Sequence, residues 1–180
     1  MNSLFLDTHK SKEFSILVQT EKTILTKKGH DAAQEALKYI QELTNNQIDE
    51  IIITTGPGSL TGLRIGSALA TGLALAKKIK VKGISIWELM FLEYPDAEIL
   101  FYTGTKKWIY KTLNTEQIIN FEELINIKIK QNWITNNQEK LLAFFPKENN
   151  INYPEMIILM HKYKTKASCD INLHYPITLF

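Results

Sequence analysis

The chain has 180 residues and a net charge of +2, enough length to bury a core in one domain or two small lobes, and too little charge to argue for nucleic-acid binding by the chain alone. Its single cysteine, Cys169, excludes an intrachain disulfide and a cysteine-based metal site. The first residues lack a basic segment and reach Asp7 too early for a secretory signal, so we expect a cytoplasmic protein.

The first half of the sequence predicts a mixed sheet with helices. Runs rich in β-branched and aromatic residues predict strands, and apolar residues at helical spacing predict two longer helices and a short one. The order β-β-β-α-β-α-β predicts a sheet that begins as an antiparallel meander and ends in βαβ units. The predicted strands are 4–8, 13–19, 22–26, 51–55 and 82–86, and the predicted helices are 31–43, 60–78 and 87–92.

The segment Tyr94-Pro95-Asp96 predicts a boundary between a first lobe, 1–94, and a smaller second lobe, 95–180. The second lobe carries strand candidates at 98–102, 108–113 and 133–135, an apolar segment at 125–129, helix candidates at 138–145 and 155–163, and a β-like tail at 171–180. No repeat is recognisable in the sequence.

The most distinctive segment joins the predicted strand 51–55 to the helix 60–78. Gly56-Pro57-Gly58 is a strong turn signal, and backbone N–H groups at the start of a helix suit an anion or a partner's backbone. No lysine follows Gly62, so the segment is not a Walker A loop, and its G-x-G-x-x-x-G spacing does not fit the dinucleotide fingerprint. A plain strand-to-helix turn explains the same residues.

The helix that follows has no charged residue from Ile65 to Ala76. Gly62, Gly66, Ala70 and Ala74 recur every four residues and therefore line one face. Because an interior glycine costs a helix about 1 kcal/mol relative to alanine, we expect another backbone close to Gly66 and Gly72. One side of the helix would face its own sheet and the other a second helix, in this chain or in a partner; a central core helix of a monomer is the alternative.

Several of these residues together resemble the TsaB (YeaZ) family. They are Asp7-Thr8 at the end of the first strand, the Gly56–Gly66 loop and helix, the spacing between them, and His30 before the helix at Asp31. The resemblance covers residues 1 to about 92. It implies an α/β fold of the actin-like, Hsp70-like ATPase superfamily (ribonuclease H-like), with a mixed sheet in the first lobe and a smaller, diverged second lobe.

The family consists of non-catalytic subunits of the bacterial machinery that makes threonylcarbamoyladenosine in tRNA. The resemblance implies binding to a TsaD-type catalytic subunit through a helical bundle, with a TsaE-type ATPase and tRNA reached through the complex, and a homodimer when the partner is absent. It implies no membrane contact. The partner interface that it implies comprises Ala33, Leu37, Gly62, Leu63, Gly66, Leu69, Ala70 and Leu73.

A second set of residues would face a nucleotide if one is bound: Asp7, Thr8, Gly56, Pro57, Gly58, Ser59, Thr61 and Arg64. Asp7 fits a metal-facing acid as in actin-like ATPases, or a turn aspartate. Arg64 is the only arginine, and its planar fork suits loop carbonyls or a carboxylate, unless it is a chance surface residue. We expect no cofactor held firmly by this chain; ATP or ADP and Mg²⁺ would belong to the complex.

The second lobe departs from the family, because Thr103–Tyr110 lacks the family's acid and arginine and the C-terminal Pro-x-Tyr-x-Arg is not recognisable. The four histidines of the whole chain are scattered and form no metal-binding pair, so we expect no catalytic residue and no metal site. The alternative is a diverged ATPase or phosphotransferase acting on its own through Asp7 and the loop 56–61. Two lysine runs, Lys77–Lys82 and Lys162–Lys166, would touch tRNA phosphate or simply be solvated.

Overall fold

The computed structural model describes residues 1–10, 12–45, 47–104, 106–129, 132–142, 144–145 and 150–171. Among these residues the chain divides into two units, the first formed by 1–89 and 155–171 and the second by 90–154. The segment 155–171 therefore groups with the first unit, although the division at residue 94 placed it in the second lobe.

The first unit contains a five-stranded sheet in the order β3-β2-β1-β4-β5. β1, β2 and β3 form an antiparallel meander, and β4 and β5 continue from β1 in parallel, as the sequence predicted. β3 begins two residues later than predicted because Thr20–Thr23 form the preceding turn, with Thr20 N donating to Thr23 O at 2.8 Å. The strands are β1 Ser3–Asp7, β2 Phe14–Gln19, β3 Ile24–Gly29, β4 Glu50–Thr54 and β5 Lys80–Ile84.

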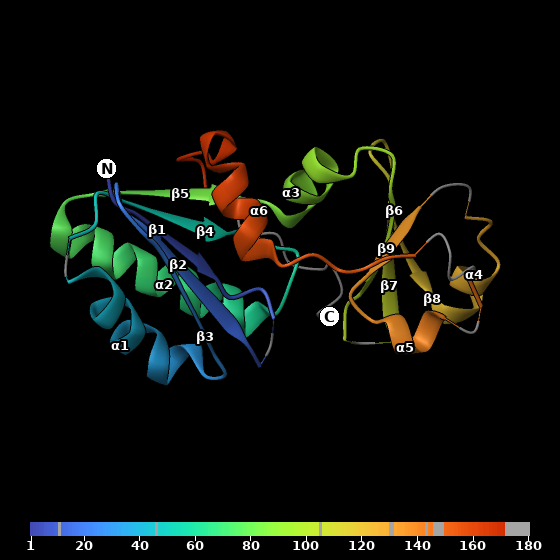
Figure 1. The fold of residues 1–180 in the computed structure, drawn as a ribbon. Helices are drawn as coiled ribbons and strands as arrows, with labels where there is room; N and C mark the ends of the chain where they lie inside the picture. Colours follow the sequence, from blue (N-terminus) through green and yellow to red (C-terminus); the bar gives the residue numbers. More distant parts are fainter. Residues whose placement is uncertain are drawn as a thin grey trace. The chain divides into compact units, whose positions relative to one another are not determined.

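Helices cover both faces of this sheet (Figure 1). α1, Ala32–Thr44, begins where the Asp31 carboxylate accepts hydrogen bonds from the backbone N–H groups of Ala33 and Gln34. α2, Leu60–Lys77, packs beside α1 against β4 and β5, and α6, Met156–Lys162, contacts β1 and β2. β1 and β4 are therefore buried along their whole length, as expected for central strands covered on both faces.

The core between the sheet and the helices α1 and α2 is aliphatic. Side chains at alternate positions of the strands meet small and branched side chains of the two helices. Its fully buried members include Leu4, Leu6, Ile16, Ile51, Ile53, Ala36, Ile40 and Ala70. Because Leu4 and Leu6 face this core, Phe5 points to the opposite face, where its ring meets that of His161 on α6.

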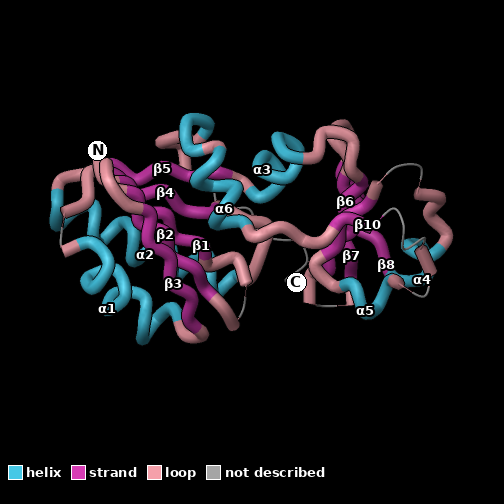
Figure 2. The backbone as a smooth tube through the Cα atoms, in the orientation of Figure 1, coloured by secondary structure: helices cyan, strands magenta, loops and turns pink. Residues whose placement is uncertain are grey.

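The second unit repeats the topology of the first, with sheet order β10-β9-β6-β7-β8 (Figure 2). β6, β7 and β8 form an antiparallel meander, and β9 and β10 lie parallel to β6. The two units therefore share the same strand order and connectivity, although the sequence shows no repeat. The elements are β6 Glu98–Tyr102, β7 Lys107–Lys111, β8 Glu116–Asn120, β9 Trp133–Thr135 and β10 Asn150–Ile151, with α4 Phe121–Ile125 and α5 Gln138–Leu141; α3, Ile86–Glu93, joins β5 to β6.

Differences from the predicted elements are concentrated in this unit. β8 escaped prediction because its first two residues, Glu116 and Gln117, are polar and exposed. The apolar segment 125–129 only ends α4 and then lies outside helices and strands. α5 ends at Leu141 instead of residue 145, and β10 was not predicted. The predicted tail at 171–180 lies almost wholly outside the described residues.

Candidate functional site

The carboxylate of Asp7 lies at the end of β1, where the register places it beside the end of β4. Its Oδ1 accepts hydrogen bonds from Thr54 Oγ1 at 2.9 Å, from His9 Nδ1 at 2.7 Å and from the His9 backbone N–H at 3.2 Å. Asp7 is only 6% exposed, so these three donors replace the water that the buried carboxylate has lost.

The pKa of Asp7 results from opposing effects. Burial of the carboxyl raises the pKa, but the electrostatic attraction of His9 and the hydrogen bonds from His9 and Thr54 lower it, and together they prevail. The pKa of Asp7 is therefore below its ordinary value, and the carboxylate is ionised at neutral pH. The carboxylate oxygen Oδ1 is occupied by hydrogen bonds from within the chain, which fits the turn-aspartate interpretation better than a metal-facing acid.

The loop between β4 and α2 closes on the turn after β1. The Ser59 backbone N–H donates to His9 O at 2.7 Å, and a Cβ placed on Gly58 would lie 2.5 Å from the same oxygen. On its other side, Gly56 O accepts from the Ile86 N–H at 2.7 Å. Ser59 Oγ caps α2 by accepting from the Gly62 N–H at 3.2 Å. The backbone N–H groups of Ser59 and Gly62, two of those expected to face an anion or a partner, are thus used within the chain.

The small-residue face of α2 also packs inward. A Cβ on Gly62 would collide with the backbone oxygen of Thr8, and one on Gly66 would collide with Thr8 Oγ1. A backbone was expected close to Gly66, but the nearest atoms there belong to the side chain of Thr8, and the close backbone lies instead at Gly62. At Gly72 no described atom of this chain lies within 4 Å of the Cβ position, so the expected neighbouring backbone does not come from the described part of this chain.

The opposite side of α2 is exposed, and we call Ala68, Thr71, Gly72 and Leu75 its outward face. Leu75 is 75% exposed, a high value for a leucine, and Leu37 on the adjacent helix α1 is 43% exposed. Apart from Arg64, α2 carries no charge from Leu60 to Ala76. The predicted partner interface did not include these four residues, although their spacing on the side opposite Gly62 and Gly66 identifies them as one face.

The structure separates the residues of the predicted partner interface into three groups. Ala33 and Leu37 are exposed, Leu69 and Leu73 are half-buried against the core, and Gly62, Leu63, Gly66 and Ala70 are buried in the chain's own packing. The predicted nucleotide-facing residues divide similarly. Asp7, Thr8, Gly56 and Pro57 are buried, Gly58 and Ser59 are half-buried, and Thr61 and Arg64 are exposed.

The described residues also bear on metal binding and membrane insertion. Within the described residues, no group of three or more His, Cys, Asp or Glu side chains is arranged to hold a metal ion. None of the described helices combines the length and the hydropathy that a membrane span requires.

Two units that each place an antiparallel meander beside two parallel strands define an α/β fold of the actin-like ATPase type. Residues 26–153 match the model of the family TsaD, tRNA N6-adenosine threonylcarbamoyltransferase, and the chain belongs to this family. No curated protein matches the chain significantly.

Two solved structures share the fold. One, an uncharacterized protein with similarity to the peptidase YeaZ from Pseudomonas aeruginosa, is 16% identical over 96% of this chain and 97% of its own, with a TM-score of 0.68. The other, YeaZ from Pseudomonas aeruginosa, is 20% identical over 74% of each chain, with a TM-score of 0.56. With the family match, they confirm the resemblance to the TsaB (YeaZ) proteins.

Proposed function

We propose that this protein is a non-catalytic subunit of the machinery that makes N6-threonylcarbamoyladenosine in tRNA, and that it binds a TsaD-type catalytic subunit through α1 and α2. The observation that supports this most is the exposed, uncharged outward face of α2, with Leu75 at 75% exposure beside Gly72 and Thr71. Depletion of charge and exposure of large apolar side chains are features of interface cores.

The residue types on this face suit helix-to-helix contact. Ala68 and Gly72 have little or no side chain, so a partner helix can approach the backbone of α2 closely. Leu75 and Leu37 then provide apolar area to bury, and complete burial of one leucine contributes about 2 kcal/mol. The same face can pair with a second copy of the chain when the partner is absent, since such patches can be self-complementary.

The turn around Asp7 gives little support to the alternative, an ATPase or phosphotransferase acting alone. Asp7 Oδ1 accepts three hydrogen bonds from within the chain, and the Ser59 N–H donates to His9 O. We therefore propose that this chain holds no nucleotide firmly, and that ATP or ADP with Mg²⁺ binds at the level of the complex. Titration calorimetry of the isolated chain with ATP and Mg²⁺ should give no saturable heat. Saturable binding that disappears in Asp7→Ala would favour the ATPase.

The interface is tested by size-exclusion chromatography with light scattering, using the chain and TsaD from the same organism. The wild type should form a stable heterodimer, and Leu75→Glu should weaken it by at least tenfold, because the carboxylate would be buried without a partner. Leu113→Glu is the matched control, since Leu113 is 60% exposed in the second unit. Absence of a wild-type complex would refute the proposed partner, and equal effects of the two variants would refute the proposed face.

The further partners can be tested by reconstitution. We propose that a TsaE-type ATPase and tRNA join through the complex. A mixture of TsaD, TsaE, a threonylcarbamoyl-adenylate source and tRNA should then modify the tRNA only when this chain is added. Modification at the same rate without the chain would contradict the proposed role.

A further inference from the structure

Two lysine runs, 77–82 and 162–166, are separated by 79 residues in the sequence and contain no acid. The fold brings the segments that carry them together in the first unit. The Gly83 N–H donates to Ser168 O at 2.7 Å and the Ser168 N–H donates back to Gly83 O at 2.9 Å, so the chain following the second run pairs with β5.

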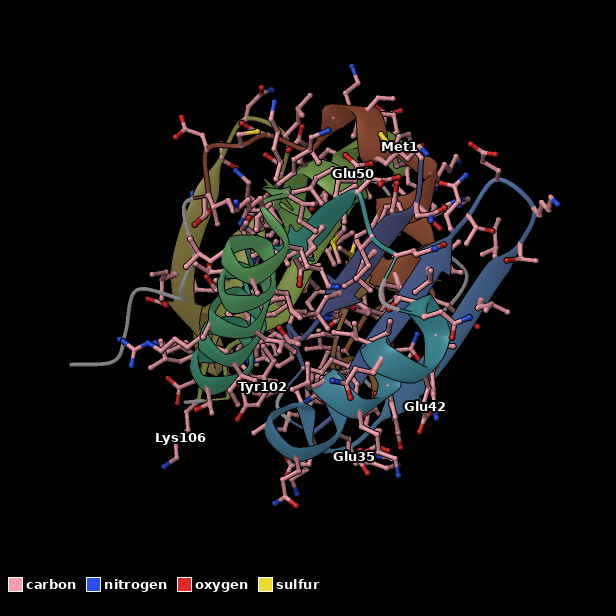
Figure 3. All side chains as sticks on the ribbon, turned by 90° about the vertical axis from the view of Figure 1, so that its left-hand side faces the viewer. Met1, Glu35, Glu42, Glu50, Tyr102 and Lys106 are labelled. Atoms are coloured by element: carbon pink, nitrogen blue, oxygen red, sulfur yellow. The ribbon has the colours of Figure 1, made fainter. Side chains whose placement is uncertain are left out.

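Both runs contribute to a network around the carboxylate of Glu50. Glu50 is 5% exposed and accepts hydrogen bonds from Lys82 Nζ at 2.8 Å and from Ser3 Oγ at 2.7 Å. Burial raises the pKa of Glu50, but the hydrogen bonds from Lys82 and Ser3 and the charges of Lys82 and Lys164 lower it on balance. Lys164, from the second run, therefore acts on the same carboxylate as Lys82. Figure 3 labels Glu50 and Met1 at one end of the first sheet.

These residues lie on one face of the sheet. The strand register pairs Gln19 with Ser3, Ser3 with Glu50, and Glu50 with Lys80, and directly paired residues point to the same side. Lys164 Nζ donates to Gln19 Oε1 at 2.7 Å, which fixes the second run over the other end of this row. Since Gln19 is neutral, this hydrogen bond holds Lys164 in place without neutralising its charge.

Three further lysines accompany this ion pair. Lys82 pairs with Glu50, and we call the exposed Lys80 and Lys166 together with the half-buried Lys164 the lysine surface. The apolar residues within the first run, Ile79 and Val81, pack against the core of the unit, so they are not available for insertion into a lipid bilayer. A solvated polyanion fits this surface better than a membrane does.

We propose that the lysine surface binds the phosphate backbone of RNA. Flexible lysines bind phosphates as point charges and release the counterions that surround the nucleic acid. The net charge of +2 for the whole chain does not oppose this, because the positive charge is local. The identification of the RNA as tRNA rests on the proposed function. The arrangement of the lysines supports binding of RNA phosphate independently of that function. The surface would add phosphate contacts to a complex whose catalytic subunit selects the base.

The test compares two triple variants with equal net charge. One carries Lys80→Glu, Lys164→Glu and Lys166→Glu, and the control carries Lys12→Glu, Lys107→Glu and Lys128→Glu at exposed positions elsewhere. The probe is a fluorescently labelled tRNA transcript, titrated with the full-length chain at several salt concentrations. A neutral variant with glutamine at positions 80, 164 and 166 keeps the test valid if charge reversal beside Glu50 unfolds the protein.

Wild-type affinity should fall with salt, and the surface variant should bind about tenfold more weakly, with a log–log salt slope smaller by about 2 to 3, because each lost phosphate contact removes about 0.9. The control should lose less than threefold. Equal losses in both variants, or no wild-type binding at 50 mM salt, would overturn the proposal. The proposal would also be overturned if the surface variant bound phosphatidylglycerol vesicles more weakly than the wild type but bound tRNA equally well. Light scattering with TsaD on the same samples reports the proposed function separately, since the lysine surface lies outside α1 and the outward face of α2.

Discussion

Glycines lie on both sides of α2, but their surroundings differ between the two sides. On the inward side, Gly62 and Gly66 leave room for Thr8, whose backbone oxygen and hydroxyl occupy the places where Cβ atoms would lie. On the outward side, Gly72 meets no described atom within 4 Å of its Cβ position, although it weakens the helix as much as Gly66 does. The inward glycines are explained by this chain's own packing, and Gly72 is not; a contact of the kind proposed above would explain it.

The largest expected effect is on the inward side. Gly66→Leu should lower the free energy of unfolding by about 3 kcal/mol, because the added side chain collides with Thr8 in a packed core. Gly72→Leu, on the open side, should not lower the free energy of unfolding, because the side chain meets open space and leucine favours a helix over glycine. Urea denaturation of both variants makes the comparison. Similar losses of unfolding free energy in both variants would show that the two sides of α2 are packed alike.

A second effect concerns the turn that Thr8 shares with Asp7. Asp7→Asn should cost about 2 kcal/mol at neutral pH, because charged hydrogen bonds to His9 and Thr54 are lost. The folded-state pKa lies below the ordinary value of 3.8, so the carboxylate stabilises the fold above that value, and this stabilisation disappears as the pH falls through the folded pKa.

The acid side of the stability curve should therefore be flatter in Asp7→Asn than in the wild type between pH 4.5 and pH 2.5. Urea denaturation across this range measures it, with the exposed Asp96→Asn as the control. An unchanged slope in Asp7→Asn would mean that Asp7 is not the group that carries this pH dependence.

A third effect tests whether α1 shares the outward surface. Leu37→Glu should weaken association with TsaD about fivefold to tenfold, less than Leu75→Glu does, because Leu37 is 43% exposed and has less area to bury. Its free energy of unfolding should change by less than about 0.5 kcal/mol. Ile158→Glu on α6, where the isoleucine is 50% exposed, is the control in the same light-scattering experiment. A loss in the control as large as that of Leu37→Glu would remove α1 from the interface.

The smallest effect has the opposite sign. Gly72→Ala should raise the free energy of unfolding by about 1 kcal/mol, because the methyl group meets open space and alanine favours the helix. Thermal melting of the isolated chain measures the gain. If a partner backbone approaches Gly72, the same variant should also weaken the complex. A destabilised isolated chain would mean that the space beside Gly72 is already filled.

Much of the first unit could be predicted from local signals. Asp31 and Ser59 begin α1 and α2 as their capping chemistry predicts, and the apolar runs set the order of β1 to β5. The second unit was harder, because β8 begins with exposed Glu116 and Gln117 and β10 has two residues. Strands that short or that polar lack the alternation on which sequence reasoning depends.

The sequence by itself determined which residues share a face, because helical and strand periodicities are local: Gly62, Gly66 and Ala70 fall on one side of α2 whatever surrounds it. Only the tertiary structure decided what covers each face. It set Thr8 against the glycines, left Leu75 exposed, returned α6 to the first sheet and joined the two lysine runs through Gly83 and Ser168. These outcomes depend on contacts between residues far apart in the chain, which no local pattern encodes.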